Sequence, residues 1–236
     1  MSISQYIKKI TPGALDKTDV GNRVDIWKVS ISDIKNNIQK LPEILSGDEV
    51  KRVSKYRLNK DKIHFTISRT VLRTILSSYV EKRPEDIIFS YTGTLKPVLN
   101  TQDGGRQIYF NVSHSNGLIL YAVCCDNDIG IDVECLPSTL NSDALAKRFF
   151  SLGEREYLSS MPLEERRKEF TKIWVIKEAY LKATAKSISD AENVEVVTEK
   201  NKSLILKYNG ENVNLDKWKI YQFELEKDYV ACVVYK

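Results

Sequence analysis

Hydrophobic and polar positions repeat along this chain with two different periods, and each period predicts its own kind of element. Apolar residues recur at three- and four-residue steps over 61–79 and over 165–184, which predicts two long amphipathic helices. Shorter helices are predicted over 31–39 and 47–56. Alternating or continuous apolar runs predict strands over 24–29, 87–91, 97–99, 107–112, 118–124, 130–134, 194–197, 203–208, 218–225 and 229–234. A chain this rich in both kinds of element is expected to have an α+β fold.

The two long helical segments share a feature that indicates duplication. One contains Phe65-Thr66 and the other Phe170-Thr171, and both halves of the chain close with predicted strands. We therefore expect two similar α+β units, each with a long helix packed on an antiparallel sheet. The boundary is placed near 126–129, where CDNDIG is typical of a turn, giving an N-terminal half 1–126 and a C-terminal half 127–236.

Composition narrows the class of protein but does not define a function. Charged residues make up 29% and apolar residues 42%, and the excess of Lys and Arg over Asp and Glu gives a net charge of +4. This mild charge permits an anionic partner without demanding nucleic acid. The chain starts without the apolar stretch of a signal peptide, and its longest apolar run is too short to span a membrane. We expect a cytoplasmic protein that neither crosses a membrane nor binds nucleic acid.

The first informative residues are carboxylates. In the strand GIDVE, Asp132 and Glu134 lie on one face, and two neighbouring carboxylates repel unless a cation such as Mg²⁺ lies between them. In WVIKEAYLK, Glu178 and Lys182 are four residues apart on one helix face. Each segment alone fits a solvated surface better. Together they fit a metal–phosphate site, in which the acids hold the cation and the ammonium neutralises phosphate oxygens.

A third segment adds polar groups at the end of an apolar strand. FNVSHS, residues 110–115, leads into Ser113 and His114, one of only two histidines, so a His-rich zinc site is excluded. Hydroxyls, backbone N–H groups and an imidazole suit phosphate binding. A plain polar turn at the end of the strand is the alternative.

These three segments, in this order, resemble one family. The patterns FNxSHS, GIDxE and WxxKEAxxK are similar to those of the 4'-phosphopantetheinyl transferases of the Sfp type, over about residues 47–190. The resemblance implies a pseudo-dimer of two α+β halves with the active site in the cleft between them. It also implies an enzyme of the holo-acyl-carrier-protein synthase type, which moves the phosphopantetheine arm of coenzyme A onto a serine of an apo carrier protein and releases 3',5'-ADP.

The resemblance also implies roles for individual residues. Asp132, Glu134 and Glu178 match the metal-binding acids, for Mg²⁺ or alternatively Mn²⁺. Lys182, Ser113 and His114 match residues that contact the phosphates of coenzyme A, and Lys96 matches a coenzyme-binding lysine before a proline. Arg52, Arg69 and Arg73 form a basic cluster that could hold the 3'-phosphate. The catalytic set is thus Glu178, Asp132, Lys182 and His114. From the charges we expect Glu178 to act as the base, directly or through a metal-bound water.

The chain departs from the family pattern in two places. Thr184-Ala185-Lys186-Ser187-Ile188 stands where the family has a pattern like TGKGL, and Leu95 stands where glycine is common. Both departures leave the shape of a coenzyme- or carrier-contacting loop open.

The partners follow from the same resemblance. We expect coenzyme A, an acidic apo acyl or peptidyl carrier protein of fatty acid, polyketide or nonribosomal peptide synthesis, and a monomer with one complete site. Two alternatives use the same residues: a metal-dependent phosphodiesterase or nuclease, and a non-catalytic carrier-binding module.

Overall fold

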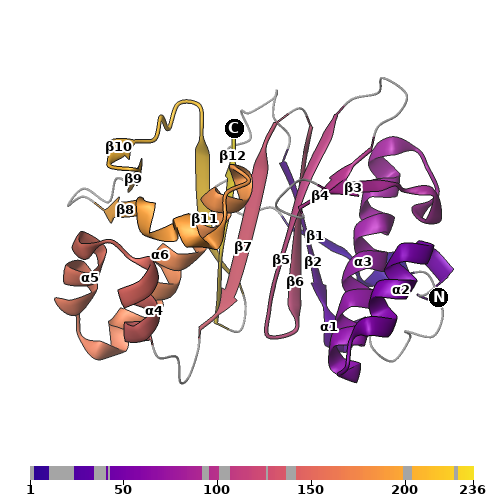
Figure 1. Cartoon of the computed structure of the whole chain (residues 1–236), viewed down its shortest axis with the longest axis horizontal. Helices are drawn as coiled ribbons and strands as arrows, with labels where there is room; N and C mark the ends of the chain where they lie inside the picture. The colour runs from indigo at the N-terminus through magenta and orange to yellow at the C-terminus, as the bar shows by residue number, and fades with distance from the viewer. Residues whose placement is uncertain are drawn as a thin grey trace.

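Two antiparallel sheets stand side by side at the centre of the molecule, and a long helix covers the outer face of each (Figure 1). This computed structural model describes residues 3–10, 24–34, 41, 43–91, 96–100, 107–125, 127–136, 142–198, 204–225 and 228–236. Mixed helices and antiparallel sheets agree with the expected α+β class.

The first sheet has the strand order β1-β2-β6-β5, with β1 Lys8–Ile10, β2 Val24–Ser30, β6 Leu118–Cys125 and β5 Ile108–Ser115. Helix α3, Asn59–Val80, packs on its outer face through a stripe that includes Ile67, Val71 and Ile75. The shorter elements of this part are η1 Ile3–Tyr6, α1 Ile31–Ile34, α2 Gly47–Lys55, η3 Pro84–Asp86 and the hairpin of β3 Phe89–Tyr91 with β4 Pro97–Leu99.

The second sheet has the order β11-β12-β7, with β11 Lys219–Leu225, β12 Tyr229–Tyr235 and β7 Ile129–Cys135. Helix α6, Leu163–Ala183, packs on its outer face through residues that include Ile176, Ala179 and Ala183. In both sheets the strand that precedes the long helix pairs with the last strand of the hairpin that follows it, β2 with β6 and β7 with β12.

A third core lies between the two sheets, and strand β6 shows why its sequence is continuously apolar. Ile119, Tyr121 and Val123 pack toward α3, whereas Leu120 and Ala122 pack toward the second sheet. Because neighbouring side chains of a strand point to opposite faces, a strand that is covered on both faces has no polar positions.

Several elements differ from those the sequence predicts. Helices α4 Ser142–Phe149 and α5 Leu152–Ser159 were not predicted, although Ser151 and Glu154 form a capping box at the start of α5. Strand β5 continues through the whole of FNVSHS, and the turn comes only at Asn116-Gly117, where both φ angles are positive. The helix predicted over 31–39 is present as α1, and 35–40 lie outside the described residues.

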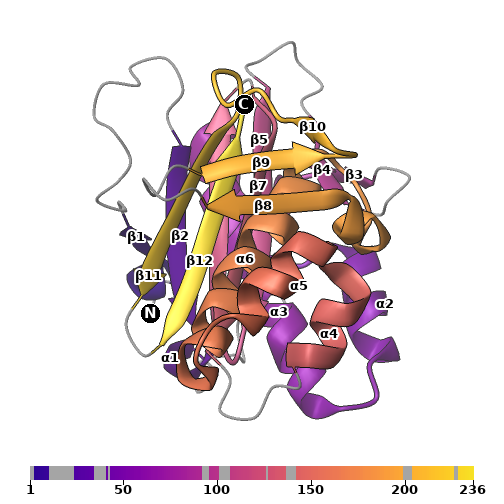
Figure 2. The ribbon, with the colours of Figure 1, turned by 90° about the vertical axis from the view of Figure 1, so that its left-hand side faces the viewer.

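The remaining strands form a small separate sheet. They are β8 Val194–Thr198, β9 Leu204–Tyr208 and β10 Glu211–Asn212, in the order β10-β9-β8, reached from α6 through η4 Ile188–Asn193. Figure 2 shows β8 and β9 running across the upper part of α6. Among the helices in the described residues, none is long and apolar enough to cross a membrane.

Candidate functional site

The site begins where the two sheets meet, at strands β5 and β7. Backbone N–H groups along the free edge of β7 donate hydrogen bonds to side chains of β5, and not to the backbone of β5. Three β7 amides donate to them: Ile131 N to Asn111 Oδ1 at 2.9 Å, Val133 N to Ser113 Oγ at 3.4 Å, and Cys135 N to Ser115 Oγ at 3.1 Å. We call this row of contacts the seam. It places the polar side chains of FNVSHS beside the acids of GIDVE.

The two strand acids are held from the same seam. Ser113 Oγ donates to Asp132 Oδ1 at 2.7 Å, and Ser115 Oγ donates to Glu134 Oε2 at 2.7 Å. Asp132 is 2% exposed, and its second oxygen, Oδ2, is buried without a hydrogen-bond partner among the described residues. A buried carboxylate oxygen without a partner is costly unless a cation or another donor satisfies it.

Helix α6 brings the third acid and the lysine onto these strand residues. Lys182 Nζ lies 2.6 Å from Asp132 Oδ1, 3.7 Å from Glu178 Oε2 and 3.1 Å from Ser113 Oγ. The helix comes this close because Gly130 has no side chain where α6 crosses β7. The structure therefore gathers Asp132, Glu134, Glu178, Lys182 and Ser113 at one point.

The charges at this point do not balance. Three carboxylates face a single ammonium, and their mutual repulsion affects their protonation. Burial, with the charge of Asp132 next, raises the pKa of Glu178 to about 7, while Lys182 opposes the shift. Burial also raises the pKa of Glu134, against the bond from Ser115. Excess negative charge and the unpartnered Asp132 Oδ2 fit a divalent cation with oxygen preference. In the described part of the chain, however, no three His, Cys, Asp or Glu side chains already lie in an arrangement that could hold a metal ion, so the three acids would have to draw together around one.

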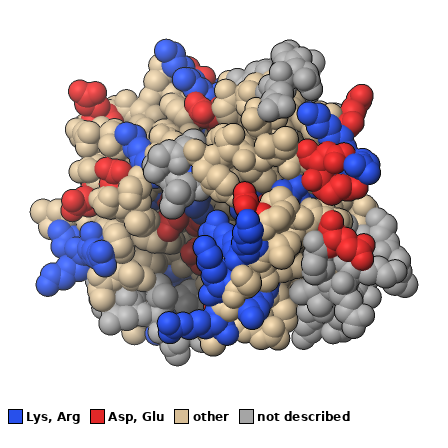
Figure 3. Space-filling view, turned by 45° about the vertical axis from the view of Figure 1, so that its right-hand side comes forward, with Lys and Arg blue, Asp and Glu red and all other residues tan. Residues whose placement is uncertain are grey.

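A cavity of about 900 Å³ opens at strand β5, where His114 lines it. Its lining is cationic on one side and includes none of Asp132, Glu134 and Glu178. Arg52, Lys60 and Arg69 come from α2 and α3, and His64 of α3 meets His114 of β5 with ring centroids 4.2 Å apart. Burial lowers the pKa of both imidazoles; His64 is lowered further by His114, and His114 by Lys182. Figure 3 shows Lys and Arg side chains gathered at the centre of this side of the molecule.

The three arginines of the predicted basic cluster differ in their surroundings. Arg52 is exposed at the cavity. Arg69 pairs with Glu49 at 3.3 Å, and its Nη1 is buried without a hydrogen-bond partner in the described residues. Arg73 is 1% exposed, with Nε 2.7 Å from Glu49 Oε2 and Nη1 2.8 Å from Ile87 O. Arg73 thus ties α2 and the segment before β3 to α3. We therefore do not propose it as a coenzyme-binding residue.

Lys96 lies on the other side of the acids. Its Nζ donates to Lys182 O at 2.8 Å and to Ile129 O at 3.3 Å, at the end of α6 and the start of β7. Burial and the nearby Lys182 lower the pKa of Lys96, with Asp128 opposing. The predicted lysine is therefore a neighbour of the acid cluster.

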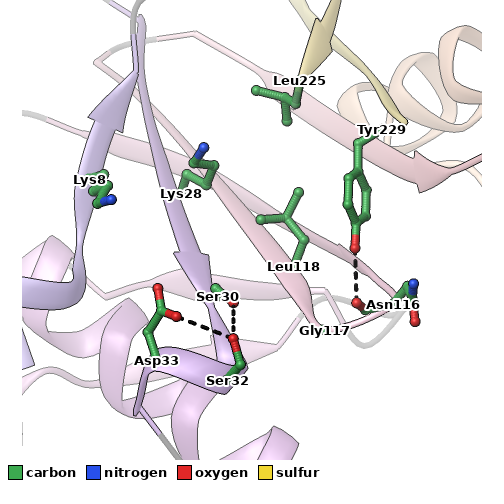
Figure 4. Close-up of a pocket in the computed structure, with 10 residues that line it drawn as sticks. All are labelled: Lys8, Lys28, Ser30, Ser32, Asp33, Asn116, Gly117, Leu118, Leu225 and Tyr229. Carbon is green, nitrogen blue, oxygen red and sulfur yellow. Dashed lines mark hydrogen bonds between the residues drawn. The ribbon is translucent and has the colours of Figure 1, made fainter. Parts of the chain in front are cut away.

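A second cavity, of about 350 Å³, lies across the Asn116-Gly117 turn from the first (Figure 4). Lys8, Lys28 and Asp33 line it, and Tyr229 Oη donates to Asn116 O at 2.9 Å beside it. Arg52, Arg69 and His114 of the predicted site line the first cavity, and no predicted site residue lines the second, so coenzyme binding is assigned to the first.

Some residues of the site were not singled out from the sequence. His64 stands alone in an amphipathic helix, and only the fold brings it to His114. The sequence predicts Ser115 only as one of the polar residues that end the FNVSHS strand, with no role of its own. Lys177, which directly precedes Glu178 in WVIKEAYLK, is fully buried. Its Nζ lies 2.6 Å from Glu154 Oε2 and donates to Val194 O. The alternation of Asn111, Ser113 and Ser115 was the one signal that could have revealed the seam.

Family models match both parts of the chain. Residues 128–234 match the model described as the 4'-phosphopantetheinyl transferase superfamily, and residues 27–126 match that of the N-terminal part of 4'-phosphopantetheinyl transferases.

Individual proteins are similar over much of the chain. The 4'-phosphopantetheinyl transferase HetI of Nostoc sp. is 37% identical over 179 residues, 76% of each chain. The 4'-phosphopantetheinyl transferase psf-1 of Bacillus pumilus is 33% identical over 66% of this chain and 64% of its own. The 4'-phosphopantetheinyl transferase gsp of Aneurinibacillus migulanus is 27% identical over 55% of this chain and 51% of its own.

Proposed function

This chain belongs to the 4'-phosphopantetheinyl transferase superfamily, and we propose from its site that it moves the phosphopantetheine arm of coenzyme A onto a serine of an apo carrier protein. One observation carries the proposal: Asp132, Glu134, Glu178 and Lys182 converge at strand β7, and the adjoining strand β5 carries His114 into a cavity with a cationic rim. Clustered acids suit a divalent cation, and cations and imidazoles suit the phosphates of the coenzyme.

Coenzyme A is proposed to lie in the larger cavity. Arg52 and His114 stand at its wall, and Arg69 offers a buried N–H group without a partner in the described residues. A planar guanidinium group can bind two oxygens of one phosphate at once, which suits recognition of the 3'-phosphate. Ser113, Lys182 and Lys96 then lie on the side of the pyrophosphate. Lys60 and His64, which line the same cavity, are added to this set.

Asp132, Glu134 and Glu178 are the residues proposed to hold Mg²⁺. Their fit rests on the unpartnered Asp132 Oδ2 and on the burial of Glu178 beside other carboxylates, which together raise its pKa. When bound, the cation would neutralise the pyrophosphate and so stabilise the departing 3',5'-ADP.

The proton chemistry is assigned to Glu178. A carboxylate with a pKa of about 7 can accept a proton near neutral pH. The carrier serine loses its hydroxyl proton to Glu178 as its oxygen bonds to the β-phosphorus. The bond from that phosphorus to the bridging oxygen of 3',5'-ADP breaks, and Lys182 and His114 stabilise the charge on the phosphate oxygens.

The same proposal covers the organisation of the molecule and its partner. Matching strand pairings around α3 and α6 support two duplicated halves, 1–126 and 127–236, with the site in the cleft between them. A monomer is proposed because a single chain supplies all these residues. Segment 51–62 carries six basic residues against one acid, which supports an acidic carrier protein. The comparisons favour neither a nuclease nor a non-catalytic binding module.

The test is transfer of the arm to purified apo carrier proteins, followed by intact mass spectrometry with coenzyme A and Mg²⁺. Asp132→Asn and Glu178→Gln should each slow the transfer by about 100-fold or more, because each removes a charged group from the reacting centre. Glu165→Gln, an exposed acid on the same helix, is the matched control. Near-wild-type rates in both site variants would show that the reaction does not depend on these acids.

A further inference from the structure

The seam residue Ser115 has no role in the proposal above, yet it makes the same pair of contacts as Ser113. Its Oγ accepts from Cys135 N at 3.1 Å and donates to Glu134 Oε2 at 2.7 Å. Ser113 Oγ accepts from Val133 N and donates to Asp132 Oδ1. Each hydroxyl is therefore tied to the backbone of β7 and also to a carboxylate of β7.

The repetition follows from strand geometry. Ser113 and Ser115 are two residues apart on β5, and Asp132 and Glu134 are two residues apart on β7. Side chains two residues apart share a face and are separated by the same step on any strand. Two strands in matched alignment can therefore pair each serine with one acid, as the seam does.

A hydroxyl that accepts from an amide and donates to a carboxylate has its single hydrogen committed. The amide occupies a lone pair of Oγ, and the hydrogen is aimed at the acid. Serine carries no charge, so Ser115 can fix the direction of the Glu134 carboxylate without neutralising it. Lys182 differs, because its ammonium group pairs with Asp132 and offsets its charge. In metal sites, the side chain that binds the metal is commonly held in place by a hydrogen bond from a neighbouring residue. Loss of that hydrogen bond weakens metal affinity by about 10- to 100-fold.

The geometry points to Ser115 as a positioning residue for the divalent cation: by holding Glu134 toward Asp132 and Glu178, it sets the affinity of the site for metal. This inference rests on the proposed function, because it takes the three acids as the metal ligands. Ser113 shares its hydroxyl with Lys182 at 3.1 Å, so Ser115 is the position where the orientation of an acid can be tested without disturbing that lysine. Glu134 also accepts a hydrogen bond from the Trp174 side chain, which Ser115→Ala leaves in place.

The experiment measures Mn²⁺ binding by electron paramagnetic resonance, with coenzyme A present and no carrier. Ser115→Ala should weaken Mn²⁺ binding by about 10-fold or more. Ser115→Thr, which keeps the hydroxyl on a half-buried strand position, should stay within about threefold of wild type. In the transfer assay, Ser115→Ala should raise the Mg²⁺ concentration needed for half-maximal rate more than it lowers the rate at saturating Mg²⁺.

Asn111→Ala is the matched control, since it removes a seam bond to Ile131 N and touches no acid. It should lower thermal stability and leave Mn²⁺ affinity within about threefold of wild type. The inference is overturned if Ser115→Ala binds Mn²⁺ like wild type, or if Asn111→Ala or Ser115→Thr loses as much affinity. A wild-type protein that neither binds Mn²⁺ nor modifies any carrier would overturn the proposed function, and the inference with it.

Discussion

Gly130 of β7 lies against Ala179 of α6 so closely that a Cβ at Gly130 would come 2.0 Å from the carbonyl oxygen of Ala179. The same atom would lie 2.4 Å from Ala183 N. Both neighbours are backbone atoms of a helix, which cannot move aside as a flexible side chain can. The glycine of GIDVE thereby sets the distance between the strand that carries Asp132 and the helix that carries Glu178.

Gly130→Ala should therefore force β7 and α6 apart. We expect a loss of about 4 kcal/mol or more in the free energy of unfolding, the range of severe core overpacking. Urea denaturation measures this loss. Gly47→Ala is the control, because a Cβ at Gly47 meets nothing within 4 Å. Equal stability in the two variants would contradict the close approach.

Glu178 makes stability depend on pH when metal is absent. Its pKa is about 7 in the folded protein and 4.5 when unperturbed, so the folded state binds the extra proton between these values. Stability from this group is then fully present below pH 4.5 and is lost as the pH rises through about 7.

Chelator-treated wild type should accordingly lose stability between pH 5 and pH 8 relative to Glu178→Gln, by an amount on the order of 1–3 kcal/mol. Urea denaturation at the two pH values gives the comparison. If the two proteins changed in parallel, Glu178 would titrate at its ordinary value.

Lys177 points away from Glu178 and ties α6 to Glu154, with both side chains at most 1% exposed. Lys177→Met should cost about 3–5 kcal/mol, because it leaves a buried carboxylate without its cation. Adding Glu154→Gln should recover part of that loss. Lys168→Met is the surface control: its pair with Glu224 is 2.7 Å long, but its side chain is 45% exposed, and we expect a change of about 1 kcal/mol or less.

Binding of 3',5'-ADP should couple to the histidine pair. Burial lowers the pKa of both His64 and His114, His114 lowers that of His64 further, and Lys182 lowers that of His114, so both imidazoles are mostly neutral at pH 7 in the free protein. A bound phosphate favours the charged imidazole, which means that binding takes up a proton and weakens as the pH rises from 6 to 8. Calorimetry in buffers of different ionisation enthalpy, without metal, measures this uptake. His64→Gln should reduce it, and an unchanged uptake would place the phosphate elsewhere.

The sequence predicts the long helices well because their apolar period is strong. The predicted 61–79 and 165–184 correspond to α3 Asn59–Val80 and α6 Leu163–Ala183. Helices α4 and α5 are short, and α5 buries little beyond Leu158 and the Glu154 that pairs with Lys177, so its pattern is weak. Short helices are stabilised mainly by packing, which a period does not reveal.

The site is predicted in part. The acids and Lys182 stand out because their strand and helix motifs together resemble one family, although each motif alone fits a solvated surface better. Arg73 stands out for the same reason, yet the fold buries it against Glu49. FNVSHS is predicted as the end of a strand because an apolar run gives way there to small polar residues. What they meet is another strand, and only the tertiary structure shows that partner.

The seam also bears on aggregation. Strands β5 and β7 are the last strands of their sheets, and an open edge strand is a template on which other chains can add strands. Here each edge covers the other, and the β7 amides at Ile131, Val133 and Cys135 are already occupied by side chains. The opposite edge of the first sheet, β1, is three residues long and carries Lys8 and Lys9, features that discourage strand addition. The residues that assemble the proposed active site therefore also keep the edges of β5 and β7 from pairing with strands of other copies.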